Sequence, residues 1–223
     1  MAEIFHRRFF VKGPAGRLEA TLWTQPTSEM PRMAAVVCHP HPLYGGTLHN
    51  KVVYQVAKTL HRLSLPVLRF NFRGAGTSEG THDEGRGEQD DVRAAIDFLA
   101  EHFSGAPILL VGFSFGAVVG LRVGCSDARV AELVGLGLPA NNSDLTFLAM
   151  CRKPKLFVQG GQDQYGSQEN VDALMETLPE PKRLVVVENA DHFFTGKLDP
   201  MNRAVGEWMN ERHPEWGSAR GAA

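Results

Sequence analysis

The sequence has few cysteines, no excess of basic residues and no long apolar run, and each of these absences excludes a class of protein. It has only three cysteines, Cys38, Cys125 and Cys151, which lie far apart with no C-x-x-C pair. We therefore expect reduced, mostly buried thiols in a cytoplasmic protein rather than a disulfide framework. An excess of basic charge is also missing, since 23 Lys and Arg stand against 25 Asp and Glu, a net charge of −2. A chain with this charge balance lacks the excess of basic residues that is typical of nucleic-acid-binding proteins, so no nucleic acid partner is expected.

Long apolar runs are absent as well. No segment approaches the roughly 18 apolar residues that a membrane span needs, so no membrane partner is expected. Residues 1–10 lack the apolar stretch and cleavage site of a signal peptide, which again favours the cytoplasm. What is present is a globular composition, with 43% hydrophobic and 22% charged residues. That is ample material for a hydrophobic core.

Short apolar runs alternate with amphipathic stretches along the chain. Continuous apolar runs are typical of strands buried on both faces, and the stretches between most of them have helical period. The pattern predicts an α/β fold with a doubly wound, mainly parallel sheet of about eight strands, the first two antiparallel. The expected strands are residues 5–11, 17–23, 34–38, 66–70, 107–111, 133–138, 155–158 and 183–187. The expected helices are residues 51–63, 88–103, 117–123, 168–178 and 198–211.

No internal repeat or low-complexity linker divides the sequence. We therefore expect residues 1–212 to form a single domain, which is an ordinary size for an α/β fold. Residues 213–223 are polar and rich in small residues, and we expect them to form a flexible tail.

A glycine-flanked serine stands between a predicted strand and a predicted helix, in the pattern Gly112-x-Ser114-x-Gly116. A serine at such a turn has strained backbone geometry, and its hydroxyl projects above the sheet. The glycines let neighbouring backbone pass closely, and the helix that follows points N–H groups at any oxyanion formed there. The pattern predicts a nucleophile elbow. The alternative is a glycine-rich turn with an incidental serine.

Two further reactive side chains follow later strands. Asp163 comes after the seventh strand and His192 after the eighth. Active sites of open α/β sheets gather at the carboxyl ends of the strands, so we expect both to meet Ser114. His192 would accept the serine proton, and Asp163 would fix the imidazole tautomer and stabilise the imidazolium.

Both partners have competitors. Asp144 follows an earlier strand and Asp191 adjoins the histidine, but sequence neighbours rarely meet side chain to side chain. Asp163 is favoured because it follows the penultimate strand behind a glycine turn. His213 is the other late histidine, and it lies in the expected tail.

The loop after the third strand, residues 38–46, is expected to complete an oxyanion hole. One donor is expected to be the N–H of Phe115, and the other should come from this loop. Pro40 and Pro42 have no N–H, so His41 is the first candidate and Leu43 the second. The H-x-H pair at 39 and 41 also suits two metal ligands. No third ligand follows at the required spacing, so no metal is expected.

Two other features of the sequence have a structural and a functional interpretation. Residues 74–80 faintly resemble a dinucleotide fingerprint, but Glu79 stands where the third glycine belongs, so we expect a structural loop and no cofactor. Arg73 either pins this loop or contacts substrate, and pinning is favoured. The apolar acyl pocket is expected to be lined by Leu43, Tyr44 and Phe193, with Phe115 as a further candidate. Phe113 and Phe194 either line this pocket or belong to the core.

With these residues in place, the sequence resembles the α/β-hydrolase superfamily over essentially its whole length. It looks most like the small, lidless bacterial serine hydrolases related to dienelactone hydrolases. His39-Pro40-His41-Pro42 stands where many members carry H-G-x-P, whose third residue supplies an oxyanion N–H, which favours His41. Asn71-x-Arg73-Gly74-x-Gly76-x-Ser78 matches the acid-x-R-G-x-G-x-S loop, with asparagine replacing the acid. Gly160-x-x-Asp163 and Asp191-His192 match the acid and base loops.

The resemblance implies a Ser-His-Asp hydrolase. Ser114 argues against dehalogenase and epoxide hydrolase chemistry, whose nucleophile is aspartate, and against dienelactone hydrolase activity proper, whose nucleophile is cysteine. Larger members insert a lid after the sixth strand, but only residues 139–153 separate the sixth strand from the seventh here. That is too little for a cap domain, so the site is expected to be open.

We therefore expect a serine hydrolase that cleaves carboxylic esters of small or accessible acyl substrates through an acyl-Ser114 intermediate. An acyl thioesterase or peptidase with the same triad is an alternative. So is a non-catalytic binding protein, because fold does not fix function. The expected partner is a small ester. The oligomeric state is left open, homodimer included.

Overall fold

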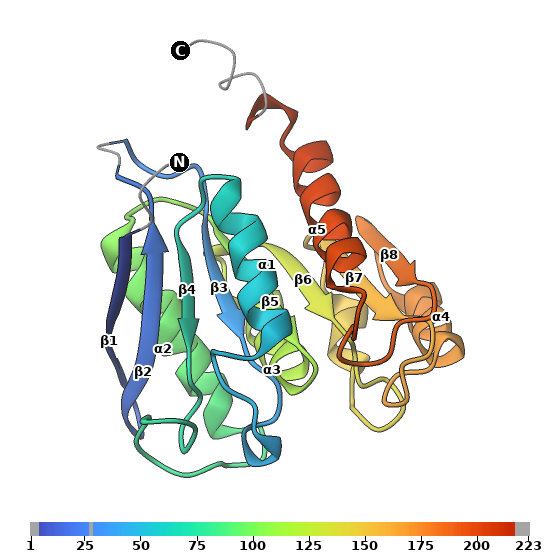
Figure 1. The fold of residues 1–223 in the computed structure, drawn as a ribbon, viewed down its shortest axis with the longest axis horizontal. Helices are drawn as coiled ribbons and strands as arrows, with labels where there is room; N and C mark the ends of the chain where they lie inside the picture. Colours follow the sequence, from blue (N-terminus) through green and yellow to red (C-terminus); the bar gives the residue numbers. More distant parts are fainter. Residues whose placement is uncertain (1–4, 27–28, 217–223) are drawn as a thin grey trace.

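A computed structural model describes residues 5–26 and 29–216 of the chain (Figure 1). An eight-stranded sheet forms the middle layer, and helices cover both of its faces. The strands are β1 (Phe5–Gly13), β2 (Gly16–Thr24), β3 (Ala34–Cys38), β4 (Val67–Phe70), β5 (Ile108–Phe113), β6 (Val130–Leu136), β7 (Lys155–Gly160) and β8 (Lys182–Val187). The helices are α1 (Lys51–Arg62), α2 (Gly87–His102), α3 (Phe115–Ser126), α4 (Gln168–Thr177) and α5 (Leu198–Arg212).

The sheet has the strand order β1-β2-β4-β3-β5-β6-β7-β8. β2 pairs antiparallel with both β1 and β4, and the pairs from β4 through β8 are parallel. The predicted α/β fold with a mainly parallel, eight-stranded sheet is confirmed. Because the parallel strands point the same way, the loops after β3, β5, β7 and β8 leave the sheet at one edge.

Two apolar cores lie on opposite faces of the sheet. α1 and α5 pack on one face around the buried Val53, Val56 and Trp208, and α2 and α3 pack on the other around Ile96 and Leu121. In α1 the buried positions recur at helical spacing, and the side chain of its N-cap residue, Asn50, accepts the N–H of Val52 at 2.9 Å. The central strands are buried along their whole length, which explains their unbroken apolar runs.

The sequence placed the sixth strand at residues 133–138, whereas β6 spans Val130–Leu136. The strand ends early because Gly137 takes a left-handed φ of 53°. The third helix was also expected too short. It begins directly after Ser114 and contains three glycines, Gly116, Gly120 and Gly124. Glycines are weak helix formers, and those at 116 and 124 lie outside the expected range and hid its length.

Within residues 5–26 and 29–216, no cap domain covers the sheet edge. Residues 137–154 connect β6 to β7 and contain only the short 3-10 helix η2 (Thr146–Met150). After α5, residues expected to open a flexible tail form a further 3-10 helix, η3 (Pro214–Trp216), where the His213 and Trp216 rings stack at 4.1 Å. The rest of that tail, residues 217–223, lies outside the described residues. None of the described helices is long and apolar enough to span a membrane.

Candidate active site

The turn between β5 and α3 holds Ser114 in a conformation that is rare for a residue with a side chain. Its φ is 55° and its ψ is −120°, which stores strain that the surrounding structure must hold. A Cβ on Gly112 would lie 2.5 Å from Ala117 N, and one on Gly116 would lie 2.5 Å from Cys38 O. Both flanking glycines are therefore required by close backbone approach. The Ser114 N–H donates to Leu136 O at 2.9 Å and ties the turn to β6.

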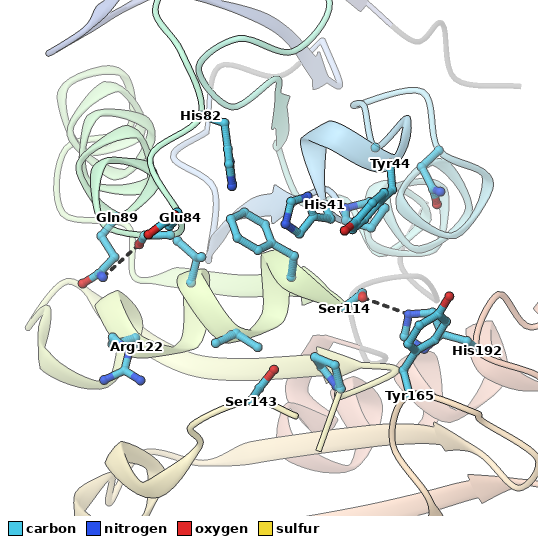
Figure 2. A pocket seen from close by; sticks show the side chains of 18 of the residues that line it. His41, Tyr44, His82, Glu84, Gln89, Ser114, Arg122, Ser143, Tyr165 and His192 are labelled. Carbon is cyan, nitrogen blue, oxygen red and sulfur yellow. Dashed lines mark hydrogen bonds between the residues drawn. The ribbon is translucent and has the colours of Figure 1, made fainter. Parts of the chain in front are cut away.

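Ser114, His192 and Asp163 form one hydrogen-bonded row. The Ser114 Oγ to His192 Nε2 distance is 2.8 Å, and His192 Nδ1 lies 2.8 Å from Asp163 Oδ2. Figure 2 shows the first of these bonds, at one end of a pocket. Ser114, His192 and Asp163 follow β5, β8 and β7, respectively. His192 is 29 positions from Asp163 and 78 from Ser114 in the sequence, and the three meet at this edge of the sheet.

The Asp163 carboxylate is buried and receives four N–H donors. Oδ1 accepts from the backbone of Tyr165 at 2.8 Å and of Gly166 at 3.1 Å, while Oδ2 accepts from Gln159 Nε2 and His192 Nδ1, both at 2.8 Å. These donors replace water around the charged group. With its proton on Nδ1, the imidazole presents Nε2 as an acceptor toward the Ser114 hydroxyl.

Gln159 is a residue of this region that sequence reasoning missed. It is fully buried at the end of β7, and its amide also bonds Gly166 O at 2.8 Å and the Leu138 backbone through both its oxygen and its nitrogen. The side chain therefore joins the loops after β6 and β7 beneath Asp163. The available signal was a polar residue at the end of a buried apolar strand.

Aromatic rings surround His192. Tyr165 meets the imidazole edge-on at a centroid distance of 4.7 Å, and Phe113 lies 5.1 Å away on the sheet side. Phe113 and Phe194 are fully buried and belong to the core, whereas Phe193 is 48% exposed and lines the pocket. Tyr165 was not among the residues expected from the sequence, because its position depends on how the loop after β7 folds.

The loop after β3 approaches Ser114 from the other side. It contains the 3-10 helix η1 (Pro42–Tyr44), and the Leu43 N–H donates to His41 Nδ1 at 3.3 Å. Among the described residues, no protein acceptor takes the backbone N–H of His41 or of Phe115. The two candidate loop donors therefore differ: Leu43 N–H is engaged within its own turn and His41 N–H is not.

His39 anchors this loop from within the core. Its Nδ1 lies 2.6 Å from Pro40 O, and its Nε2 accepts the Phe72 N–H at 2.9 Å. Burial lowers the pKa of His39 to about 4, so the ring is neutral at ordinary pH. A neutral ring with one donor and one acceptor satisfies both of these bonds at once.

The row faces a pocket of about 870 Å³. Tyr44 and Tyr165 lie at the serine end, whereas Arg122 and Glu84 lie at the far end (Figure 2). Phe115 and Phe193 also line the pocket. Tyr44 is 87% exposed at the rim, so the pocket opens to solvent. Leu43 was expected here too, but η1 turns it outward, where it is 68% exposed and not part of the lining.

The segment between β4 and α2 supplies one wall that the sequence did not predict. The His82 ring packs 4.8 Å from that of His41, and His82 Nδ1 lies 2.8 Å from the buried Glu88 Oε1. Glu88 also accepts the N–H groups of Asp83 and Gly85, each at 2.9 Å, which shapes the loop. Burial lowers the pKa of His41, and the neighbouring His82 lowers it further.

The competing residues are engaged elsewhere. Asp144 pairs with Arg122 at 3.0 Å, Asp191 accepts the N–H of Thr195 at 2.8 Å, and His213 lies 3.3 Å from Glu132. Arg73 pins its loop through a bidentate pair with Asp91 of α2, at 2.8 Å for the closest contact, and does not line the pocket. Within the described ranges, no group of three or more His, Cys, Asp or Glu is placed to hold a metal ion.

Comparison with known proteins places these observations in a family. The alpha/beta hydrolase domain family matches residues 33–204. The uncharacterized protein RP471 of Rickettsia prowazekii is 34% identical over 211 residues, covering 91% of this chain and 88% of that protein. An alpha-beta serine hydrolase homologue from Coxiella burnetii has 38% identity and a TM-score of 0.82, covering 90% of this chain and 96% of that chain.

A second solved structure bears on the missing cap. XC6422 from Xanthomonas campestris, described as a serine hydrolase without lid, has 33% identity and a TM-score of 0.83, covering 95% of this chain and 94% of that chain. The connection between β6 and β7 is correspondingly short in the present chain. The family match, the eight-stranded sheet and these relatives agree: the chain belongs to the α/β-hydrolase family and is a member without a lid.

Proposed function

We propose that this protein is a serine hydrolase that cleaves carboxylic esters through an acyl-Ser114 intermediate. The observation that carries the proposal is the unbroken row from Ser114 Oγ through His192 to Asp163, with 2.8 Å at each step. Serine alone is a weak nucleophile at neutral pH, and a hydrogen-bonded imidazole supplies the base it needs.

In the first step, Ser114 Oγ attacks the ester carbonyl carbon and its proton passes to His192 Nε2. The carbonyl π pair moves to oxygen, and the ring becomes an imidazolium. Asp163, ionised beneath it, stabilises that charge and keeps the ring in place. The carboxylate is held in place for this by backbone and amide N–H groups that donate to its two oxygens.

The oxyanion is held by two backbone donors, Phe115 N–H and His41 N–H. Phe115 is the first residue of α3, so its N–H has no intrahelical acceptor, and the positive end of the helix favours the developing charge. His41 is preferred over Leu43 because the Leu43 N–H already donates to His41 Nδ1. Removing one such donor in a serine protease costs about 10²- to 10³-fold in kcat.

The intermediate then collapses. The C–O bond to the alcohol breaks, His192 Nε2 returns its proton to the leaving oxygen, and the acyl group stays on Ser114. Water enters, gives a proton to His192 as it attacks the acyl carbon, and the carboxylic acid leaves as Ser114 recovers its hydrogen. Every proton is carried by His192, so the cycle requires no cofactor.

The pocket supports small or accessible acyl substrates. It has no cap, and its rim is formed by the exposed Tyr44 and Phe193. Phe115 and Val118 give the serine end an apolar wall along α3, while Arg122 and Asp144 make the far end polar. A thioester or an anilide could be attacked by the same row, so the ester preference is the finer part of the proposal.

The experiment compares three acetyl compounds with one purified protein: p-nitrophenyl acetate, S-phenyl thioacetate and p-nitroacetanilide. We expect kcat/KM to be highest for the ester. Ser114→Ala should lower it by about 10⁴-fold or more, because the nucleophile and its base act as a unit. The matched control is Ser143→Ala, another serine of the same pocket, which should keep nearly full activity.

Two outcomes would overturn the proposal. If Ser114→Ala still hydrolyses the ester at the wild-type rate, Ser114 is not the nucleophile. A thioester turned over faster than the ester would make the protein a thioesterase instead.

A further inference from the structure

A second site on this molecule lies beside a buried arginine of β4. Arg69 is 3% exposed, although it carries a permanent charge. Its Nη1 donates to Leu48 O at 2.7 Å, while its buried Nε has no hydrogen-bond partner. Among the described residues, no carboxylate forms an ion pair with this guanidinium. Its neighbours are two aromatic rings, Trp23 at 4.2 Å and Tyr54 at 5.3 Å.

Burying a guanidinium without a counter-ion is costly. Charged groups inside proteins are normally paired, and an unpaired one is destabilising. The rings of Trp23 and Tyr54 offset part of this cost through cation–π attraction. Burial lowers the pKa of Arg69 to about 10, which still leaves it protonated at neutral pH. Its positive charge is therefore available to an occupant of a neighbouring pocket.

Arg69 lines a small pocket of about 120 Å³. This is roughly four times the ~30 Å³ that one water molecule occupies in the liquid. The pocket lies between β2, β4 and the start of α1, and none of its lining residues lines the pocket beside Ser114. Arg8 and His49, both exposed, stand at its rim and add potential positive charge.

One carboxylate, Glu19, also lines this pocket. Burial works to raise its pKa, but hydrogen bonds from Thr77 and Asn71 outweigh burial and hold it below the ordinary value. Its Oε2 accepts Asn71 Nδ2 at 2.7 Å and Thr77 N at 2.9 Å, so it is turned toward the neighbouring loop. Glu19 therefore faces its own donors and forms no bond to Arg69.

We propose that this pocket binds a small oxyanion, a carboxylate or a phosphate, on the guanidinium of Arg69. Guanidinium N–H groups form charge-assisted hydrogen bonds to carboxylate and phosphate oxygens. An occupant of this charge would supply the counter-ion that Arg69 lacks among the described residues. The site is independent of the hydrolytic row.

The test titrates the full-length protein with sodium phosphate and, separately, sodium acetate, with sodium chloride holding the ionic strength constant. Melting temperature and tryptophan fluorescence are the readouts, because Trp23 lies against the guanidinium. We expect a saturable rise in melting temperature with at least one oxyanion, and a fluorescence change with the same midpoint. Which of the two salts saturates identifies the preferred oxyanion.

The decisive variant is Arg69→Met, which keeps an apolar stem of similar length. We expect it to weaken oxyanion binding roughly ten- to a hundredfold, the value of losing charge-assisted hydrogen bonds. The matched control is Arg93→Met, an exposed arginine of α2 that pairs only with Asp90. Arg69→Met should fold, because replacing a buried charge by an apolar group is often neutral or stabilising.

Phosphate stabilises many proteins non-specifically by exclusion from their surface. An equal, unsaturable rise in wild type, Arg69→Met and Arg93→Met would therefore overturn the proposal, as would no response of the wild type to either salt. If Arg69→Met does not fold, Arg8→Gln takes its place at the rim. It should weaken binding about severalfold, the effect of an exposed charge, and an unchanged midpoint would count against the site.

Discussion

The two ends of the large pocket are built differently. At the serine end, His192 and Asp163 are almost fully buried and every polar atom of the Asp163 carboxylate is bonded. At the far end, Arg122 and Asp144 form an ion pair whose side chains are 34% and 61% exposed. Exposed pairs of this kind contribute about 0–1 kcal/mol. The side chains at the serine end are therefore held more tightly than the exposed ion pair at the far end.

The largest effect is expected from a substitution at the serine end of the pocket. Asp163→Asn should lower kcat for p-nitrophenyl acetate by about 10⁴-fold, because an amide donor at this position disfavours the productive imidazole tautomer. The matched control is Asp144→Asn, which changes the other pocket carboxylate and should cost less than about threefold. Steady-state kinetics of both variants check this. A larger loss of kcat in Asp144→Asn than in Asp163→Asn would show that Asp144, and not Asp163, supports the histidine.

An intermediate effect concerns stability and pH. The pKa of His39 falls to about 4 on folding, from about 6.5 in the unfolded chain. Between these values the unfolded state binds more protons, so the free energy of unfolding rises with pH across this window. The contribution of His39 is full above pH 6.5 and is lost as the pH falls toward 4, by about 3 kcal/mol in total.

Urea denaturation at several pH values between 4 and 8 measures this contribution. Wild type should exceed His39→Gln in stability at pH 7.5, and the gap should narrow as the pH falls. His102→Gln, a change at an exposed histidine of α2, is the control and should leave the pH profile unchanged. A gap between wild type and His39→Gln that does not depend on pH would show that His39 is not buried in its neutral form.

The smallest effect belongs to the far end of the pocket. Arg122→Gln should leave kcat for p-nitrophenyl acetate unchanged and should change the free energy of unfolding by no more than about 1 kcal/mol. KM should shift only for esters whose acyl chain carries a charge and reaches that end. Arg122 lies eight positions after Ser114, about 12 Å along the helix. A large loss of kcat for p-nitrophenyl acetate in Arg122→Gln would show that the far end of the pocket takes part in the reaction at Ser114.

The parts of the fold that the sequence predicted are those with a repeating physical signal. Strands buried on both faces give continuous apolar runs, and parallel pairing brings their carboxyl ends to one edge. Asp163 and His192 were therefore expected beside Ser114, and the structure brings all three within hydrogen-bond distance. The glycines at 112 and 116 could also be interpreted from the sequence, because the backbone packs too closely at these positions for a side chain.

The parts that the sequence did not predict depend on how loops pack. Gln159 and Tyr165 reach Asp163 and His192 only because the loop after β7 folds back, and no local pattern encodes that return. Leu43 was assigned to the pocket because it is apolar, but η1 turns it outward. Arg69 was counted inside an apolar strand, and its buried charge became evident only when its neighbours were known.

The most direct test of the central claim is covalent labelling of the nucleophile. The protein is incubated with a fluorophosphonate, and the adduct is located by mass spectrometry of proteolytic peptides. The account predicts one adduct, on Ser114, because, among the residues that the structure describes, only its hydroxyl lies 2.8 Å from an imidazole acceptor backed by a carboxylate. Asp163→Asn should slow the labelling, and Ser114→Ala should abolish it. No adduct on the wild type, or an adduct that persists in Ser114→Ala, would contradict the account.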